Sequence, residues 1–139
     1  MKVVILAGGM GSRLSEETSS KPKPLVEIGG MPILWHIMMT YYHHGLNDFI
    51  ICCGHKGYMI KEYFAKSFLH LSDFKIDVKK NNINILSKKK QKNLEIKLVD
   101  TGEKTATGGR IKKIKKYINS TFCLTYGDGV AKIDIKKLI

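Results

Sequence analysis

Three short, largely apolar runs constrain the fold of this chain more than any other feature of the sequence. They lie at residues 3–7, 49–53 and 122–126, and none of them alternates apolar with charged residues. A strand that is apolar on both faces has to be covered on both sides, which is typical of parallel sheets in α/β proteins. Segments with apolar residues at helical spacing lie between these runs. The alternation predicts βαβ units with right-handed crossovers.

The other expected elements follow from their periodicity and their end signals. Pro32 suits the first turn of a helix and Gly45 can end it, and residues 57–71 form a second amphipathic pattern. Residues 94–99 alternate apolar and charged side chains, which predicts a strand. Residues 108–118 predict a helix with isoleucines inward and lysines outward. Asp134 can cap a last, short helix.

The middle of the chain changes character and carries much of the charge. Residues 75–93 contain short alternating runs followed by a polar stretch, so we expect a basic insertion or a hairpin there. The chain has 24 Lys and Arg against 12 Asp and Glu, a formal charge of +12. Residues 79–97 hold seven Lys and one Glu and therefore supply half of that charge.

The apolar and cysteine patterns exclude several classes of protein. The first apolar run is shorter than a secretory core, and no stretch approaches the ~20 apolar residues of a membrane span. The three cysteines, Cys52, Cys53 and Cys123, show neither the even count of a disulfide framework nor the spacing of a zinc site. We expect them to be buried in a reducing cytoplasm. Cys52 and Cys53 should point to opposite faces of one strand.

The elements expected from the sequence make an incomplete fold. Three or four strands with their helices make about half of a sheet, and the last expected helix has barely begun at Ile139. We therefore expect the domain to be truncated. Either further sequence or a partner would then cover the open apolar edge.

The strongest signal for chemistry is the glycine-rich segment that leaves the first strand, at residues 8–14. A glycine turn at the carboxyl end of a parallel strand lets backbone N–H groups approach an anion. The dinucleotide fingerprint fails because Leu14 occupies its third glycine position, and neither a Walker motif nor a nucleophile elbow is present. Arg13 supplies one cation, and Lys23 between two prolines supplies another. The alternative is a plain glycine turn beside a solvated basic loop.

Two further motifs could contact an anion or a cation. Asp128 follows the third apolar run between two glycines, and such a carboxylate suits Mg²⁺ that keeps phosphate and water ligands. The alternative for Asp128 is a simple turn at a strand end. The segment from Thr107 to Arg110 opens a predicted helix, so its N–H groups can meet an anion or a base edge.

The glycine turn together with Lys21-Pro22-Lys23 resembles the signature of the sugar-1-phosphate nucleotidyltransferases. Further blocks are similar to the glucose-1-phosphate cytidylyltransferase branch of that family. These blocks lie at residues 14–18, 21–30, 32–38, 48–54, 100–102, 107–110 and 125–130. The resemblance runs from Met1 to about Asp134 and is weak only at residues 75–93. It implies a Rossmann-like, three-layer α/β fold with a mostly parallel central sheet, in which residues 1–139 are the nucleotide-binding part and the sugar-binding C-terminal part is absent.

The resemblance also implies a reaction and a site. The cytidylyl group of CTP would pass to α-D-glucose 1-phosphate, giving CDP-glucose and pyrophosphate with the help of Mg²⁺, a step in nucleotide-sugar and O-antigen synthesis. Arg13 facing the leaving pyrophosphate and Lys23 at the α-phosphate would be the catalytic residues. Asp128 would hold the metal. The nucleotide-binding residues that the resemblance implies are Leu6, Ala7, Gly8, Gly9, Met10, Gly11, Ser12, Arg13, Lys23, Thr105, Thr107, Gly108, Arg110 and Gly127.

The sequence leaves two alternative functions open and gives one expectation about the oligomeric state. A truncated chain could bind nucleotide without catalysis, because the resemblance places the sugar contacts and a second metal ligand in the missing half. A basic protein could instead bind nucleic acid, but the lysines of residues 79–92 lack interleaved aromatic residues, so a solvated surface is favoured. The full-length family form is expected to be a homo-oligomer without membrane contact. The choice of base and sugar depends on the resemblance alone.

Overall fold

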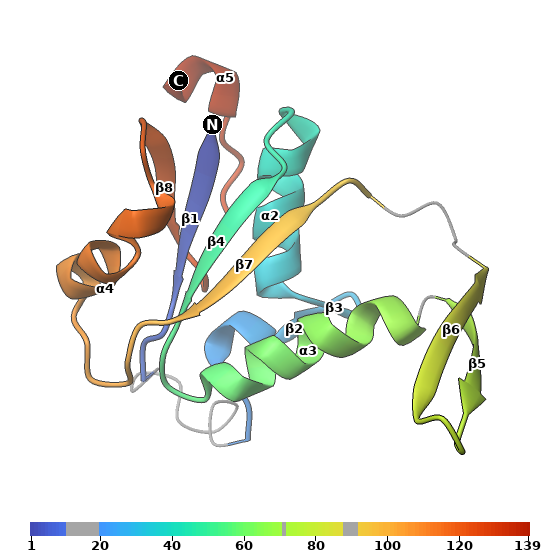
Figure 1. The fold of residues 1–139 in the computed structure, drawn as a ribbon. Coiled ribbons are helices and arrows are strands. Elements are labelled where there is room, and N and C mark those ends of the chain that lie inside the picture. The colour runs from blue at the N-terminus through green and yellow to red at the C-terminus, as the bar shows by residue number, and fades with distance from the viewer. Residues whose placement is uncertain (11–19, 71, 88–91) are drawn as a thin grey trace.

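The computed structural model describes residues 1–10, 20–70, 72–87 and 92–139, and a four-stranded sheet lies at its centre (Figure 1). Its strands are β1 (Lys2–Ala7), β4 (Asp48–Cys53), β7 (Glu95–Asp100) and β8 (Phe122–Tyr126), in the order β7-β4-β1-β8. Every neighbouring pair is parallel. Ala7 pairs with Cys53 and Cys53 with Asp100, so the carboxyl ends of these strands meet at one edge of the sheet.

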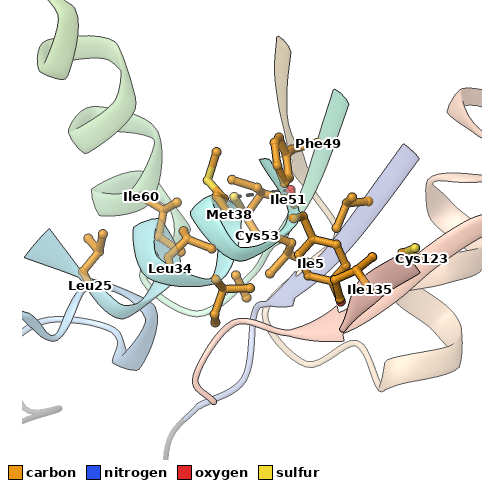
Figure 2. Close-up of a cluster of buried hydrophobic side chains, with 14 residues drawn as sticks. Ile5, Leu25, Leu34, Met38, Phe49, Ile51, Cys53, Ile60, Cys123 and Ile135 are labelled. Carbon is orange, nitrogen blue, oxygen red and sulfur yellow. Dashed lines mark hydrogen bonds between the residues drawn. The ribbon is translucent and has the colours of Figure 1, made fainter. Parts of the chain in front are cut away.

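One face of the sheet is covered by most of the helices. These are the 3₁₀-helix η1 (Lys23–Leu25), α2 (Ile33–His43), α3 (Gly57–His70) and α5 (Ile135–Leu138). Leu34 and Met38 of α2 and Ile60 of α3 are fully buried against Ile5 and Phe49 of the sheet (Figure 2). The buried faces of α2 and α3 follow the helical spacing of their apolar residues, and this face holds the larger part of the core.

The other face is covered by α4 (Thr107–Lys113) and the 3₁₀-helix η2 (Lys115–Tyr117). Ile114, which joins these two helices, packs fully buried against Val4 and Ile50. Cys52 lies in this second core and Cys53 in the first, so the prediction that they occupy opposite faces is confirmed. The three-layer α/β architecture with a mostly parallel sheet is also confirmed.

The expected single helix over residues 108–118 is wrong in its C-terminal half. The α-helix ends at Lys113, and the chain continues as the tighter η2. Ile114 has φ −94° and ψ 4°, and its N–H is shared among the carbonyls of Arg110, Ile111 and Lys112. Tightening of the last turn is common where a helix end has to adjust to the surface below it. Here it brings Ile114 down onto the sheet.

Two small antiparallel pairs complete the fold. The first joins β2 (Glu27–Ile28) to β3 (Met31–Pro32), directly before α2. The second joins β5 (Asp73–Asp77) to β6 (Asn82–Ser87) in a hairpin that stands away from the central sheet (Figure 1). It overlaps the segment 75–93, whose residues 88–91 lie outside the described part of the chain.

The last helix, α5, begins with the capping residue that the sequence predicts. Asp134 precedes α5, and its carboxylate accepts a hydrogen bond of 3.1 Å from the N–H of Lys136, as the capping prediction requires. None of the helices in the described residues is long and apolar enough to span a bilayer.

Candidate functional site

A cavity of about 500 Å³ opens at the carboxyl ends of β1 and β8, where ligands bind in open α/β sheets. Three segments that are distant in the sequence line it: the end of β1 with its glycine turn, η1, and the loop that leads into α4. The end of β8 closes the remaining side. The lining residues are Leu6, Ala7, Gly8, Gly9, Lys23, Pro24, Thr105, Ala106, Thr107, Arg110, Tyr126 and Asp128.

The glycine turn lines one side of this cavity and packs closely against neighbouring chain segments. The carbonyl of Gly8 accepts a bond of 3.2 Å from the N–H of His55, which fastens the turn to the end of β4. A Cβ atom on Gly8 would lie 2.2 Å from Nη1 of Arg110. On Gly127 it would lie 3.2 Å from the Cβ of Ala7. A side chain on Gly8 would therefore displace the Arg110 guanidinium, and one on Gly127 would be a tight contact with Ala7.

Lys23 is held on the cavity wall by the conformation of its own segment. Pro22 precedes η1 with φ −69°, and Pro24 and Leu25 are buried. The N–H of Leu25 bonds to the carbonyl of Pro22 at 2.8 Å, and the N–H of Val26 bonds to that of Lys23 at 3.0 Å. These bonds and the fixed φ of proline restrict the backbone. The structure therefore positions the Lys23 side chain at the cavity rather than leaving it on a free loop.

Arg110 is the main buried charge of the described chain, and its guanidinium joins the loops around the cavity. Its side chain is 5% exposed. Nη2 donates to the carbonyls of Gly8 at 2.8 Å and Glu103 at 3.1 Å. Nη1 donates to the Gly102 carbonyl at 2.8 Å, to Thr101 Oγ1 at 2.7 Å and to the Cys53 carbonyl at 3.3 Å. Both terminal nitrogens are thus engaged by the protein itself.

Thr101 and Lys113 extend this network to Thr105, which lines the cavity. Thr101 is fully buried, and its hydroxyl donates to the Cys53 carbonyl at 2.6 Å. Lys113 Nζ donates to the Thr101 carbonyl at 2.9 Å and to Oγ1 of Thr105 at 3.2 Å. The network therefore fixes the loop that presents Thr105 and Thr107 to the cavity.

Among the described residues that line the cavity, Asp128 is the one that carries a carboxylate. It is exposed and lies two residues beyond β8, in the turn that also contains Gly127. In the described ranges, no group of three or more His, Cys, Asp or Glu residues could enclose a metal. A single carboxylate beside a cation-lined cavity fits Mg²⁺ that takes its remaining ligands from phosphate and water, and it does not fit a metal held by protein alone.

The structure brings most of the expected site residues to one cavity. Leu6, Ala7, Gly8, Gly9, Lys23, Thr105, Thr107, Arg110 and Asp128 line it. Met10 and Gly108 are exposed outside the lining, and Gly127 is buried beside it, donating from its N–H to the Leu6 carbonyl at 2.9 Å. Gly11, Ser12 and Arg13 lie outside the described residues.

Three residues that line the cavity were not expected from the sequence: Pro24, Ala106 and Tyr126. Pro24 follows Lys23, and Ala106 lies between Thr105 and Thr107. Their position beside expected site residues could have identified them. Tyr126 ends β8 on the same side as the glycine turn and is 60% exposed. Its place directly before Gly127 and Asp128, at the end of the third apolar run, is the signal that could have identified it.

Comparison with known proteins identifies a family and two relatives of this chain. The model of the family described as "Nucleotidyl transferase" matches residues 2–132. The chain is 57% identical over its whole length to "Glucose-1-phosphate cytidylyltransferase" of Salmonella typhimurium and covers 54% of that protein. It is 46% identical to "Probable glucose-1-phosphate cytidylyltransferase" of Bacillus subtilis, again over its whole length and 54% of the relative.

A solved structure shares the fold. The crystal structure of HddC from Yersinia pseudotuberculosis complexed with GMP-PN has a TM-score of 0.65 and 29% identity, with 99% of this chain and 52% of that chain covered. The chain thus spans about half the length of the curated relatives it matches. With the matched family model extending over nearly all of its residues, the chain belongs to the nucleotidyl transferase family.

Proposed function

We propose that this chain carries the nucleotide-binding half of a glucose-1-phosphate cytidylyltransferase, which transfers the cytidylyl group of CTP to α-D-glucose 1-phosphate. The supporting observation is one cavity that combines a close-packed glycine turn, the held Lys23 and the carboxylate of Asp128. Family membership supports nucleotidyl transfer, and the names of the two relatives support cytosine and glucose 1-phosphate.

The proposed chemistry needs positioning and charge neutralisation more than covalent catalysis. The phosphate oxygen of the sugar attacks the α-phosphorus of CTP, the bond to the β-phosphate breaks, and pyrophosphate leaves in line. The ammonium of Lys23 at the cavity wall neutralises charge that grows on the α-phosphate in the transition state. Gly11, Ser12 and Arg13 are proposed to cradle the triphosphate, with Arg13 facing the leaving pyrophosphate.

The remaining cavity residues bind and orient the nucleotide. Backbone groups from Leu6 to Met10 are proposed to hold the base and ribose, with Thr105, Thr107, Gly108 and Gly127 around them. Arg110 contributes by fixing the Gly8 turn, which its bond to the Gly8 carbonyl supports. Asp128 would hold Mg²⁺, which supplies charge neutralisation to the phosphates when bound.

Nucleotide binding can be tested separately from turnover. Thermal unfolding with CTP and Mg²⁺ should show stabilisation of about 2.7 kcal/mol when the ligand is present at about 100 times its dissociation constant. UTP, dTTP and GTP should stabilise the chain less. Equal stabilisation by all four nucleotides would contradict the choice of CTP, and no stabilisation by any would contradict the assigned cavity.

Turnover is measured as pyrophosphate release from CTP, Mg²⁺ and glucose 1-phosphate. Lys23→Ala should reduce the rate by at least about 100-fold, since it removes an electrostatic contact to the reacting phosphate. Lys21→Ala is the matched control, because Lys21 belongs to the same segment and its Nζ lies 3.4 Å from Glu27 Oε1. Equal effects of the two substitutions would refute the placement of the α-phosphate. CTP-dependent stabilisation without pyrophosphate release would identify this chain as a nucleotide-binding module only.

A further inference from the structure

Thr105 lies on the cavity wall, and two contacts fix the orientation of its side chain. Nζ of Lys113 donates a hydrogen bond of 3.2 Å to Thr105 Oγ1. The methyl group faces helix α4, because a Cβ atom on Gly109 would lie 2.8 Å from Thr105 Cγ2. With its methyl group against the helix and its oxygen against the lysine, Thr105 is held in one rotamer.

Lys113 is itself held behind Thr105, outside the cavity. It lies in the last turn of α4, and its Nζ also donates to the Thr101 carbonyl at 2.9 Å. A Cβ atom on Gly102 would lie 2.8 Å from Thr105 Oγ1 and 3.0 Å from Lys113 Nζ, so the glycine leaves room for their contact. Lys113 does not belong to the described residues that line the cavity. Its ammonium group therefore meets the site through Thr105.

The ammonium group decides which hydrogen-bonding role Thr105 offers to a ligand. A threonine hydroxyl can donate its proton and accept at its lone pairs, whereas an ammonium group can only donate. The bond from Lys113 therefore occupies a lone pair of Oγ1 and turns the hydroxyl proton away from the lysine. Within the described part of the chain, no residue accepts that proton. Thr105 is thus a donor whose acceptor has to come from the contents of the cavity.

We infer that Lys113 is a positioning residue, which presents the Thr105 hydroxyl as a donor to an acceptor oxygen of the nucleoside. The inference rests on the proposed function, in which Thr105 lies beside the base and ribose. The carbonyl oxygen of cytosine accepts such a proton, whereas its amino group is a donor and does not. The charge of Lys113 polarises the hydroxyl and strengthens the bond that it donates. A phosphate oxygen would accept the same proton, so the test includes inorganic triphosphate.

Single substitutions measure each partner through the dissociation constant of CTP, obtained by titration calorimetry with Mg²⁺ on the 139-residue chain. Thr105→Val removes the hydroxyl at similar side-chain size and should weaken CTP binding about tenfold, whereas Thr105→Ser keeps the hydroxyl and should bind within about threefold of the parent. Lys113→Met removes the ammonium group and should weaken binding about fivefold. The matched control is Lys112→Met, since Lys112 is the exposed neighbour on α4, and it should bind CTP as the parent does.

The double variant separates a positioning role from a merely structural one. If Lys113 acts through the Thr105 hydroxyl, Lys113→Met combined with Thr105→Val should bind CTP about tenfold more weakly than the parent, as Thr105→Val alone does. Independent structural effects would multiply to about fiftyfold and would overturn the inference. Unchanged CTP affinity in either single variant would overturn it as well.

Inorganic triphosphate with Mg²⁺ identifies which part of the nucleotide accepts the proton. It should bind equally to the parent, Thr105→Val and Lys113→Met, because it lacks the nucleoside. Weaker triphosphate binding by Thr105→Val would place the acceptor on the phosphates and overturn the inference. A parent chain that binds no CTP would contradict the proposed function together with this inference, whereas CTP binding with multiplying losses would contradict this inference alone.

Discussion

Gly8 and Arg110 depend on each other across 102 positions of sequence. The guanidinium occupies the space that a side chain on Gly8 would take, and a Cβ on Gly54 would also lie 2.4 Å from Nη1. The arginine in turn gives the Gly8 carbonyl a charged donor in a buried position. A buried guanidinium is costly unless its donors are satisfied, and here backbone carbonyls satisfy them.

This dependence predicts different outcomes at two adjacent glycines. Gly8→Ala should lower the free energy of unfolding by about 1–3 kcal/mol, because the new methyl group displaces a guanidinium held by several hydrogen bonds. Gly9→Ala is the matched control, since a Cβ on Gly9 meets nothing within 4 Å. Urea unfolding monitored by circular dichroism measures both variants. Equal stability of the two would show that Arg110 can move away without loss.

Strand β4 is buried on both faces, and this burial changes the pKa of its two thiols. Burial raises the pKa of Cys52 and of Cys53 to about 11, from an ordinary value of 9.0. In the unfolded chain both thiols ionise near their ordinary pKa, so the folded state holds more protons between these values. The free energy of unfolding should therefore fall as pH rises from about 9 to about 11.

The contribution of β4 to this alkaline loss can be isolated. Equilibrium unfolding across the alkaline range should give a shallower decline for the double variant Cys52→Ala, Cys53→Ala than for the parent chain. The decline should not vanish, because burial also raises the pKa of Tyr41 and Cys123. An identical slope in the double variant would mean that the β4 thiols do not drive the effect.

Helix α5 is short, but one of its side chains attaches it to the main core. Ile135 is 1% exposed and packs in the cluster under α2, whereas Leu138 of the same helix is 65% exposed (Figure 2). Ile135→Ala should cost about 2–4 kcal/mol of stability, and Leu138→Ala within about 0.5 kcal/mol. Denaturant unfolding gives both values. A comparable cost at Leu138 would show that the exposed end of α5 is covered in solution.

At the scale of the whole molecule, the formal charge of +12 predicts weak, salt-sensitive attraction to any polyanion. CTP binding in the cavity relies instead on fixed groups in a confined space. Raising salt from about 0.05 M to about 0.2 M should therefore abolish retention on heparin or single-stranded DNA while CTP-dependent stabilisation persists. Filter binding and thermal unfolding measure the two effects. Retention at the higher salt, with no effect of CTP, would favour a nucleic-acid-binding protein.

The sequence by itself determined the architecture and pointed to the edge of the sheet where the candidate site is proposed. Consecutive apolar residues in three runs require burial on both faces, and the helical spacing between them provides the layers that bury them. The glycine turn after the first strand and Asp128 after the last marked the carboxyl edge of the sheet, because parallel strands bring those ends together. Local periodicity and turn chemistry predicted the parallel sheet and its carboxyl edge, and the family resemblance added the three-layer fold.

Only the tertiary structure decided the role of Arg110, the end of α4 and the open face of the hairpin. The bonds of Arg110 join loops that are distant in sequence, α4 ends where Ile114 meets the sheet, and the exposure of Phe74 and Ile76 depends on how far β5 lies from the main core. Each depends on the distance between segments that no local pattern relates. Contacts of this kind are fixed by the packing of segments that lie far apart in the sequence.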